Sequence, residues 1–304
     1  DLMKPHLKRW FPSLRVGAVR DIRDLMISAI KTHAAGIGRK RLHVALLEDK
    51  SVDAGTVEFE LVAQYFRGKG IRAVTADPQE LRLKGNEIYA KDFLVDVFYR
   101  DSEVEELIEY EEDGVCMGVV QEAFRRNQVV SSIAGDFDHK SAWELFTNPI
   151  FSKYFTPAQR ALFRNHLLWT RLVWERKTTD PNGREVDLET YAKKNRQQLT
   201  IKPNREFGGT GVAFGRNLTQ RAWERVLQRA FAHPGTSVIQ KTAHVHAEDF
   251  PYIAANGQVD LKKTYAVTGF AATRQGLAIL GRSSSRAVVN VSQGGGLIGV
   301  MKLR

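Results

Sequence analysis

Hydrophobic and polar positions in the first half of the chain alternate between a strand-like and a helix-like pattern. Short apolar runs at 42–47 and 71–75 predict buried strands, and the amphipathic stretch 54–66 between them predicts a helix. Gly68 and Gly70 follow this helix, as glycines do at helix C-termini. A strand, a helix and a strand at this spacing favour an α/β layer with a parallel sheet. Further strands are predicted at 87–90, 95–99, 119–124 and 129–133.

Helical patterns precede this region and follow it. Asp21 is a candidate N-cap for a helix whose apolar residues recur at helical spacing. The acidic run 103–113 predicts an exposed helix and loop, and 140–174 has a helical pattern throughout. Within it, Thr156 and Pro157 indicate a cap followed by proline at the first helical position.

The last third of the chain is rich in predicted strands. A helix is expected over 221–231, and the turn residues of 178–183 indicate an exposed loop. The pattern as a whole predicts an α+β protein with an N-terminal helical segment over 1–38, an α/β domain over 39–135 and a third region over 136–304. Strands in this third region are predicted at 199–202, 237–240, 264–270, 277–280 and 287–291.

Composition narrows the classes of protein. The chain has 304 residues and one cysteine, Cys116, which excludes an internal disulfide framework and a multi-cysteine metal site. No apolar run approaches the roughly 20 residues of a membrane helix, so no membrane association is expected. The first residues do not form a signal peptide, and we expect a cytoplasmic protein whose sequence here is cut from a longer one.

The net charge of +10 indicates either an anionic partner or simply a solvated basic surface. Basic residues are spread along the chain and do not interleave with aromatic residues as in a single-strand binder. A nucleic acid partner is therefore disfavoured, and its binding would fall steeply with salt. The sequence does not set the oligomeric state.

The strongest local signal is a lysine on a predicted strand that is followed by a glycine-rich turn. Lys202 ends the strand, and Gly208, Gly209 and Gly211 follow. Glycines allow the backbone to approach a polyanion closely, and exposed N–H groups can bind phosphate oxygens. Because no Gly-Lys-Ser/Thr closes the turn, it is not a Walker loop. On these residues alone, a hairpin loop that merely needs glycines is an equally good interpretation.

Five segments, in this order, resemble the ATP-grasp family. The resemblance is to a circularly permuted bacterial group related to glutathionylspermidine synthetase and glutathione synthetase, and it covers roughly residues 40–304. It implies an ATP-grasp fold over 136–304 and an α/β, Rossmann-like, substrate-side domain before it. The segments are Asp138-His-Lys140, the strand 168–173, Lys202-Pro with its Gly-Gly-x-Gly-Val turn, Val238-Ile-Gln-Lys241, and Arg282 with Asn290 and the glycines after it.

The resemblance also implies roles for single residues. Lys140 and Lys202 would contact the ATP phosphates, and the backbone of 208–211 would cover them. Gln240 and Lys241 would contact the adenine edge, and Glu248 or Asp249 would take the ribose hydroxyls. Arg282 and Asn290 would neutralise the transferred phosphate and an acyl phosphate. The implied activity is ATP-dependent ligation of a small carboxylate to an amine or peptide substrate, with ATP and Mg²⁺ as cofactors.

Two departures from the family pattern are present. Lys241 stands where the family has glutamate, and no Glu-x-Asn stretch is found to hold magnesium, so no residue is assigned as a metal ligand. The chain is therefore expected to lack an upstream magnesium-ligand segment. The alternative is a catalytically silent nucleotide-binding module, and a Glu-x-Asn in the preceding sequence would decide between the two.

Overall fold

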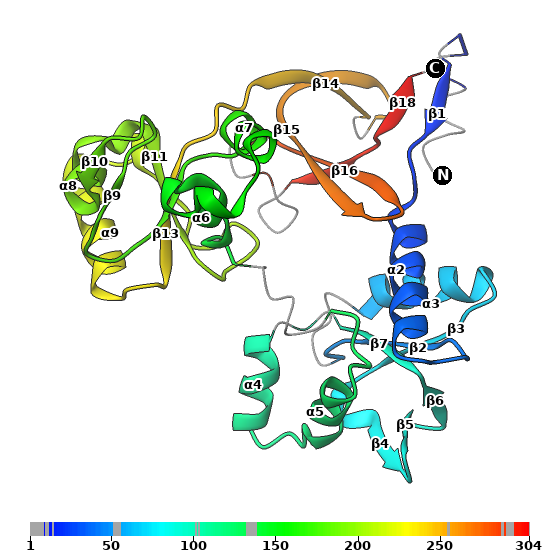
Figure 1. Cartoon of the computed structure of the whole chain (residues 1–304). Coiled ribbons are helices and arrows are strands. Elements are labelled where there is room, and N and C mark those ends of the chain that lie inside the picture. Colours follow the sequence, from blue (N-terminus) through cyan, green and yellow to red (C-terminus); the bar gives the residue numbers. More distant parts are fainter. Residues whose placement is uncertain are drawn as a thin grey trace. The chain divides into compact units, whose positions relative to one another are not determined.

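The computed structural model describes residues 9, 12–13, 15–50, 56–100, 102, 104–131, 139–253, 256–286, 289 and 295–303. The chain mixes helices and strands, in agreement with the predicted α+β class (Figure 1). It divides into two compact units, one of residues 1–136, 269–280 and 299–304 and one of residues 137–268 and 281–298. No helix in the described part of the chain has the length and apolar character needed to span a bilayer.

A parallel sheet organises the first unit. Its order is β3-β2-β7, formed by Arg72–Ala76, His43–Leu47 and Val97–Arg100, and both pairings are parallel as predicted. The last four residues of β2 are buried, which explains their continuous apolar run. The helices α2 (Ile22–Gly36) and α3 (Thr56–Gly68) pack against this sheet.

The predicted cap of α2 is present. The Asp21 side chain accepts a hydrogen bond from the backbone N–H of Arg23 at 2.9 Å. This bond satisfies one of the N–H groups that the first turn of a helix leaves unpaired.

A small antiparallel sheet and two helices complete the first unit. The sheet order is β4-β5-β6, so the strand predicted at 87–90 belongs to this sheet and not to the parallel one. These elements are η1 (Pro78–Glu80), β4 (Leu81–Lys84), β5 (Glu87–Ala90), β6 (Phe93–Val95), α4 (Val104–Glu112) and α5 (Gly118–Arg125).

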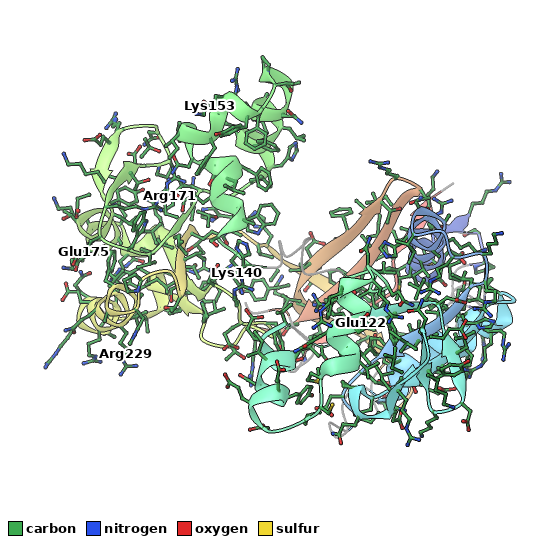
Figure 2. The ribbon with its side chains drawn as sticks, turned by 60° about the horizontal axis from the view of Figure 1, so that its bottom comes forward. Glu122, Lys140, Lys153, Arg171, Glu175 and Arg229 are labelled. Atoms are coloured by element: carbon green, nitrogen blue, oxygen red, sulfur yellow. The ribbon has the colours of Figure 1, made fainter. Side chains whose placement is uncertain are left out.

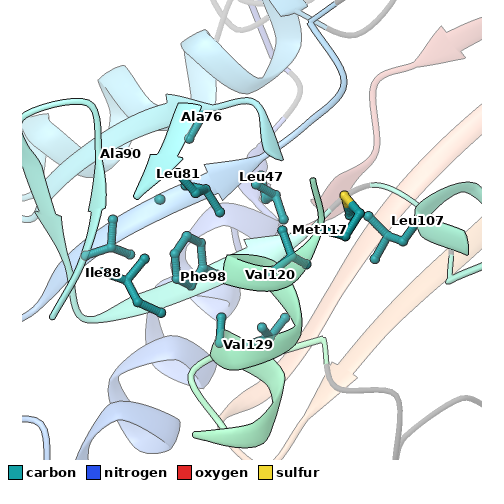
Figure 3. Close-up of a cluster of buried hydrophobic side chains, with 13 residues drawn as sticks. Leu47, Ala76, Leu81, Ile88, Ala90, Phe98, Leu107, Met117, Val120 and Val129 are labelled. Atoms are coloured by element: carbon teal, nitrogen blue, oxygen red, sulfur yellow. The ribbon is translucent and has the colours of Figure 1, made fainter. Parts of the chain in front are cut away.

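One buried cluster joins these elements to the parallel sheet (Figure 3). Phe98 of β7, Ile88 of β5 and Val120 of α5 are each at most 2% exposed. Figure 3 shows Phe98 between Ile88 and Val120, with Val129 close by. The β4–β6 sheet and α5 therefore share one core with the parallel strands.

A four-stranded sheet forms the centre of the second unit. Its order is β12-β11-β13-β8, and every pairing is antiparallel. The helices α8 and α9 pack on one face through a core that includes Trp223 and Leu227, both fully buried. The elements are β8 (Thr170–Leu172), α8 (Leu188–Lys194), η4 (Arg196–Gln198), β11 (Leu199–Pro203), β12 (Ala213–Phe214), η5 (Gly215–Asn217), α9 (Gln220–Ala232) and β13 (Ser237–Lys241).

A helical block precedes β8 in the sequence, and a hairpin follows it. The block contains α6 (Ala142–Thr147), η3 (Pro149–Tyr154) and α7 (Pro157–His166). As predicted, Thr156 caps α7 and Pro157 is its first residue. The hairpin of β9 (Lys177–Thr179) and β10 (Glu185–Asp187) encloses the predicted turn.

The remaining strands form two further sheets. One has the order β14-β15-β16-β17, and the division between the units falls within its two long strands, β15 and β16. The other pairs β1 with β18. The strands are β14 (Ala247–Ile253), β15 (Val259–Thr273), β16 (Gly276–Ser284), β17 (Gly296–Ile298), β1 (Val16–Ala18) and β18 (Met301–Leu303).

The strand predicted at 119–124 is wrong, because this segment is the helix α5. Val120 and Ala123 are buried three residues apart, and Glu122 forms an i,i+4 ion pair with Arg126 at 2.7 Å. Helical burial and this pair outweigh the strand preference of adjacent valines.

Three other predictions need correction or fall outside the description. The strand expected at 129–133 is an isolated bridge from Val129 to Phe98, and 132 and 133 lie outside the described residues. The helical pattern of 140–174 ends at His166, and the strand β8 follows within it. Most of 287–291 also lies outside the described residues.

Candidate functional site

A pocket of about 350 Å³ lies in the second unit, on the β11–β13 sheet. This volume is within the range of small-molecule sites, roughly 300–1,000 Å³. The pocket brings together six of the residues that the sequence singled out: Lys140, Lys202, Gly208, Gly209, Gln240 and Lys241.

Strand alternation explains why Lys202 and Gln240 face the pocket. In the antiparallel register, Thr200 lies opposite Gln240, and Lys202 is two residues further along β11 on the same face. Ile201 and Ile239 lie opposite each other on the other face, in the core under α8 and α9. One face of the sheet therefore packs on helices and the other supplies polar groups.

A chain of hydrogen bonds fixes Lys202. Its Nζ donates to Oε1 of Gln240 at 2.7 Å, and Nε2 of Gln240 donates to Oγ1 of Thr170 at 2.8 Å. The Thr170 hydroxyl in turn donates to the carbonyl of Leu168 at 2.9 Å. The donor and the acceptor of each bond are defined, so Lys202 and Gln240 are held in one arrangement before any ligand binds.

Burial and a second cation disfavour the charged form of Lys202. Removal from water lowers the pKa of Lys202 below its ordinary value of 10.5, and the nearby charge of Lys140 lowers it further. Among the described residues, Lys202 forms no ion pair with a carboxylate. An anionic ligand in the pocket would supply the missing opposite charge.

Lys140 connects the helical block to the segment that follows Lys202 in the sequence. Its backbone N–H donates to the carbonyl of Asn204 at 2.9 Å, and the next N–H, of Ser141, donates to Oδ1 of Asn204 at 2.8 Å. Its Nζ donates to the carbonyl of Glu206. The two lysines, which are 62 positions apart in the sequence, are thereby brought to one pocket.

The glycine-rich turn has a backbone that other residues adopt at a cost. All three of its glycines lie in the left-handed region, with φ of 68° at Gly208, 83° at Gly209 and 66° at Gly211. A Cβ on Gly211 would lie 2.6 Å from Cγ of Pro203. Two independent constraints, the positive φ and this close approach, require glycine at 211.

Replacing Gly211 by alanine is expected to deform the turn and weaken nucleotide binding several-fold. The left-handed conformation alone costs an L-residue roughly 1–2 kcal/mol, and the contact with Pro203 adds to it. Gly257→Ala is the matched control, because Gly257 has φ of 79° with nothing within 4 Å of its Cβ. Calorimetric titration with ATP should show weaker binding by Gly211→Ala than by Gly257→Ala, and equal affinities would show that the shape of the turn at 211 does not affect binding.

Four other predicted residues do not line the pocket or are not described. Gly211 lies beside the lining residues of its turn, and Glu248 is exposed on β14. Arg282 is half-buried on β16, opposite Leu297 of β17. Asn290 lies outside the described residues, although its neighbour Val289 lines the pocket. The roles of Glu248, Arg282 and Asn290 stay predictions.

Several polar residues of the pocket, Thr200 and Arg216 among them, were not predicted from the sequence. Thr200 precedes Lys202 by two on β11, so alternation along that strand could have identified it. Its hydroxyl is within 2.7 Å of that of Thr242. Arg216 comes from η5 after the turn, and no local sequence signal indicates that it reaches the pocket.

The described lining of the pocket is strongly basic. Its cations are those of Lys140, Lys202, Arg216 and Lys241, and its carboxylate is that of Glu206. Low-dielectric walls focus such a charge distribution and favour a polyanion. Positive charge, a glycine-rich turn and a half-buried lysine are the features expected of a phosphate site.

The described residues provide no magnesium site. Magnesium is usually bound by one or two carboxylates together with substrate phosphates. In the described part of the chain, no three histidine, cysteine, aspartate or glutamate side chains are grouped as metal ligands. Glu206 is the single carboxylate on the described lining of the pocket.

Comparison with known proteins places these features in context. No family model and no curated protein matches the sequence, but solved structures match it. One is a glutathione synthetase-like effector from Globodera pallida, at 11% identity and a TM-score of 0.46, covering 86% of this chain and 52% of that one. This chain thus spans about half the length of the effector.

Two bacterial proteins also match. One is D-alanyl-alanine synthetase A from Vibrio cholerae, at 11% identity and a TM-score of 0.37, covering 75% of this chain and 67% of that one. The other is a RimK domain ATP-grasp protein from Sphaerobacter thermophilus, at 14% identity and a TM-score of 0.36, covering 78% of this chain and 89% of that one. ATP-grasp proteins are among the structural neighbours of this chain. Because each TM-score is below 0.5, the function is argued from the pocket itself.

Proposed function

We propose that the pocket binds ATP and that the chain is an ATP-grasp carboxylate–amine ligase. The observation that carries the proposal is the half-buried Lys202, which meets Lys140 and a turn of left-handed glycines in one pocket. Withdrawing a lysine from water without a carboxylate partner is costly unless a ligand supplies the opposite charge. The resemblance of five sequence segments to the ATP-grasp family supports the same assignment.

The proposed reaction has two steps. A carboxylate oxygen attacks the γ-phosphorus of ATP, the bond to the β–γ bridging oxygen breaks, and ADP leaves. The amine nitrogen then attacks the acyl carbon, phosphate leaves, and the amine gives up a proton as the amide forms. Phosphoryl transfer requires mainly positioning and charge stabilisation from a protein.

The residues of the pocket have the chemistry for these tasks. Lys202 and Lys140 would bind phosphate oxygens as point charges, and the backbone of the glycine turn would lie over them. Gln240 would hold Lys202 in position from the neighbouring strand. Magnesium, when bound, would neutralise phosphate charge. The described residues do not provide its ligands.

Titration with ATP, together with an assay of ADP release, tests the proposal. Calorimetry should show ATP binding, and ADP should form over repeated turnovers only when a carboxylate and an amine substrate are both present. If ATP binds but no pair of substrates releases ADP, the chain is the catalytically silent nucleotide-binding module instead. If ATP does not bind, the glycine turn is structural and the proposal fails.

ATP affinity is expected to fall with rising pH before the pH reaches 10.5, the ordinary pKa of a lysine. The pKa of Lys202 is below 10.5 in the folded protein, so this lysine loses its proton, and with it its attraction for phosphate, earlier than an ordinary lysine. The same shift means that the unfolded chain holds more protons between the two pKa values, so conformational stability should rise with pH across that window.

Lys202→Arg is the control for this pH dependence. Arginine keeps its charge, because its pKa exceeds about 12. Affinity in this variant should stay nearly constant over the same pH range, whether or not its absolute value changes. An identical alkaline fall in the variant and the unaltered protein would assign the titration to another group.

A further inference from the structure

A second pocket, of about 650 Å³, lies in the same unit. It is enclosed by the helical block of α6, η3 and α7 and by the turn between β9 and β10. It lacks Lys140, Lys202 and the glycine turn, and it shares only Leu168 and Lys241 with the first pocket. It is therefore a separate cavity without the groups expected to bind phosphates.

Three aromatic rings form an apolar wall of this second pocket. Phe163 lies with its ring centroid 5.0 Å from those of Phe146 and Phe155, and the latter two are 5.7 Å apart. All three residues line the pocket and are only half-buried. Partly exposed aromatic faces grouped in a concave site favour a flat apolar ligand.

Positive charge surrounds this aromatic wall. Arg160, Arg164 and Lys241 line the pocket, and none of them forms an ion pair within the described ranges of the chain. Arg160 is held in place, because its Nη1 donates to the carbonyl of Ser152 at 3.1 Å. That bond uses one of the five N–H donors of the guanidinium and leaves others available for a ligand.

The lining contains one acidic side chain, and it has a structural task. Oδ1 of Asp180 accepts the backbone N–H groups of Asn182 at 2.8 Å and Arg184 at 2.9 Å. These bonds hold the β9–β10 turn in shape, as aspartate does in many turns. Asp180 therefore offsets only part of the charge of the two arginines and the lysine.

We propose that this second pocket binds a small carboxylate with an aromatic body. The aromatic wall would stack on the body, and Arg160 or Arg164 would bind the carboxylate, whose geometry a guanidinium matches in a bidentate manner. The ligand could be a free aromatic acid or the C-terminal residue of a peptide. This inference does not depend on the proposed ligase activity.

Ligand-observed NMR with phenylacetate tests the proposal, and phenylacetamide serves as the uncharged probe of the same shape. Phenylacetate should bind saturably and about 10-fold more tightly than the amide, since a hydrogen bond to a charged group contributes about 1.4 kcal/mol more than a neutral one, which is a factor of about 10 in affinity. Equal binding of the two probes, or no binding of phenylacetate, would overturn the proposal.

Variants locate the binding. Arg164→Gln should weaken phenylacetate binding about 10-fold, whereas Arg229→Gln, on the exposed face of α9, should not change it. Lys202→Ala, which removes a charge of the first pocket only, should also leave it unchanged. Weakening by Lys202→Ala but not by Arg164→Gln would place phenylacetate in the first pocket and refute the assignment.

A pair of peptides distinguishes the two sources of the carboxylate. If the ligand is a peptide terminus, a short peptide that ends in free phenylalanine should bind as tightly as phenylacetate, and its amidated form should not. If the ligand is a free acid, phenylacetate should bind and both peptides should be excluded. Binding of both peptides with equal affinity would contradict recognition of a carboxylate.

Discussion

Replacing Lys202 by alanine is expected to lower the affinity for ATP by about 10- to 100-fold while the protein stays folded. A hydrogen bond to a charged group contributes about 1.5–3 kcal/mol, which corresponds to this range of affinity. Folding should survive, because burial already disfavours the cation of Lys202 and Gln240 keeps its bond to Thr170. Calorimetric titration with ATP measures the loss.

Two controls accompany this variant. Lys153→Ala removes an exposed lysine of η3 that does not line the first pocket, and ATP should bind this variant as it binds the unaltered protein. Thermal unfolding of both variants checks that the fold is retained. A folded Lys202→Ala protein with unchanged ATP affinity would remove Lys202 from the nucleotide site.

Replacing Arg171 by leucine is expected to destabilise the second unit by about 3–5 kcal/mol. Arg171 is fully buried and donates to Oγ1 of Thr178 at 2.7 Å, to the carbonyls of Thr170 at 2.7 Å and Thr179 at 3.1 Å, and to that of Thr147 at 3.3 Å. Its loss leaves these acceptors buried without a donor, which costs far more than the net contribution of each bond. Burial lowers the pKa of Arg171 to about 10, so it still carries its charge at neutral pH.

Urea denaturation provides the measurement for this second variant. The midpoint should fall with the slope nearly unchanged, as expected for a pure loss of stability. Arg229→Ala is the matched control, because Arg229 points outward from α9 whereas Arg171 lies inside the unit (Figure 2), and its effect should stay within about 0.5 kcal/mol. Similar midpoints for the two variants would show that the Arg171 network contributes little.

The hydrogen bonds of Arg171 also link the stability of the second unit to the first pocket. The carbonyl of Thr170 accepts from Arg171, and the hydroxyl of Thr170 accepts from Gln240 and so belongs to the chain that positions Lys202. A variant at 171 is thus expected to weaken ATP binding as a consequence of local disorder. This effect should scale with the loss of stability, whereas the effect of Lys202→Ala should not.

Local patterns predicted most elements of the fold. The continuous apolar run of β2 marked a strand buried on both faces, and the parallel pairing with β3 followed from the intervening helix α3. Asp21 and Thr156 marked helix starts, because their side chains satisfy N–H groups within three residues of them. Such signals depend on neighbours in the sequence and are readable without the tertiary structure.

The wrong prediction of a strand at α5 and the correct predictions above all rest on local sequence preference. Adjacent valines favour a strand when only local preference is considered. What selected a helix was burial of Val120 and Ala123 against Phe98 and Ile88, which come from strands 20 to 35 residues away. Contacts of this kind cannot be inferred from the spacing of apolar residues in a single sequence.

The sequence by itself determined two features of the site: the alternation of side chains along β11 and the glycine-rich turn after it. The pattern placed Lys202 on a strand before a turn that only glycine adopts easily, and this much of the candidate site follows from local geometry. The tertiary structure decided which distant residues join it. Lys140 reaches the turn because its backbone and its Nζ bind Asn204 and Glu206, more than 60 positions away. The burial that lowers the pKa of Lys202 likewise exists only once the sheet and the turn enclose it, because desolvation depends on everything packed around a charge and not on its neighbours in the chain.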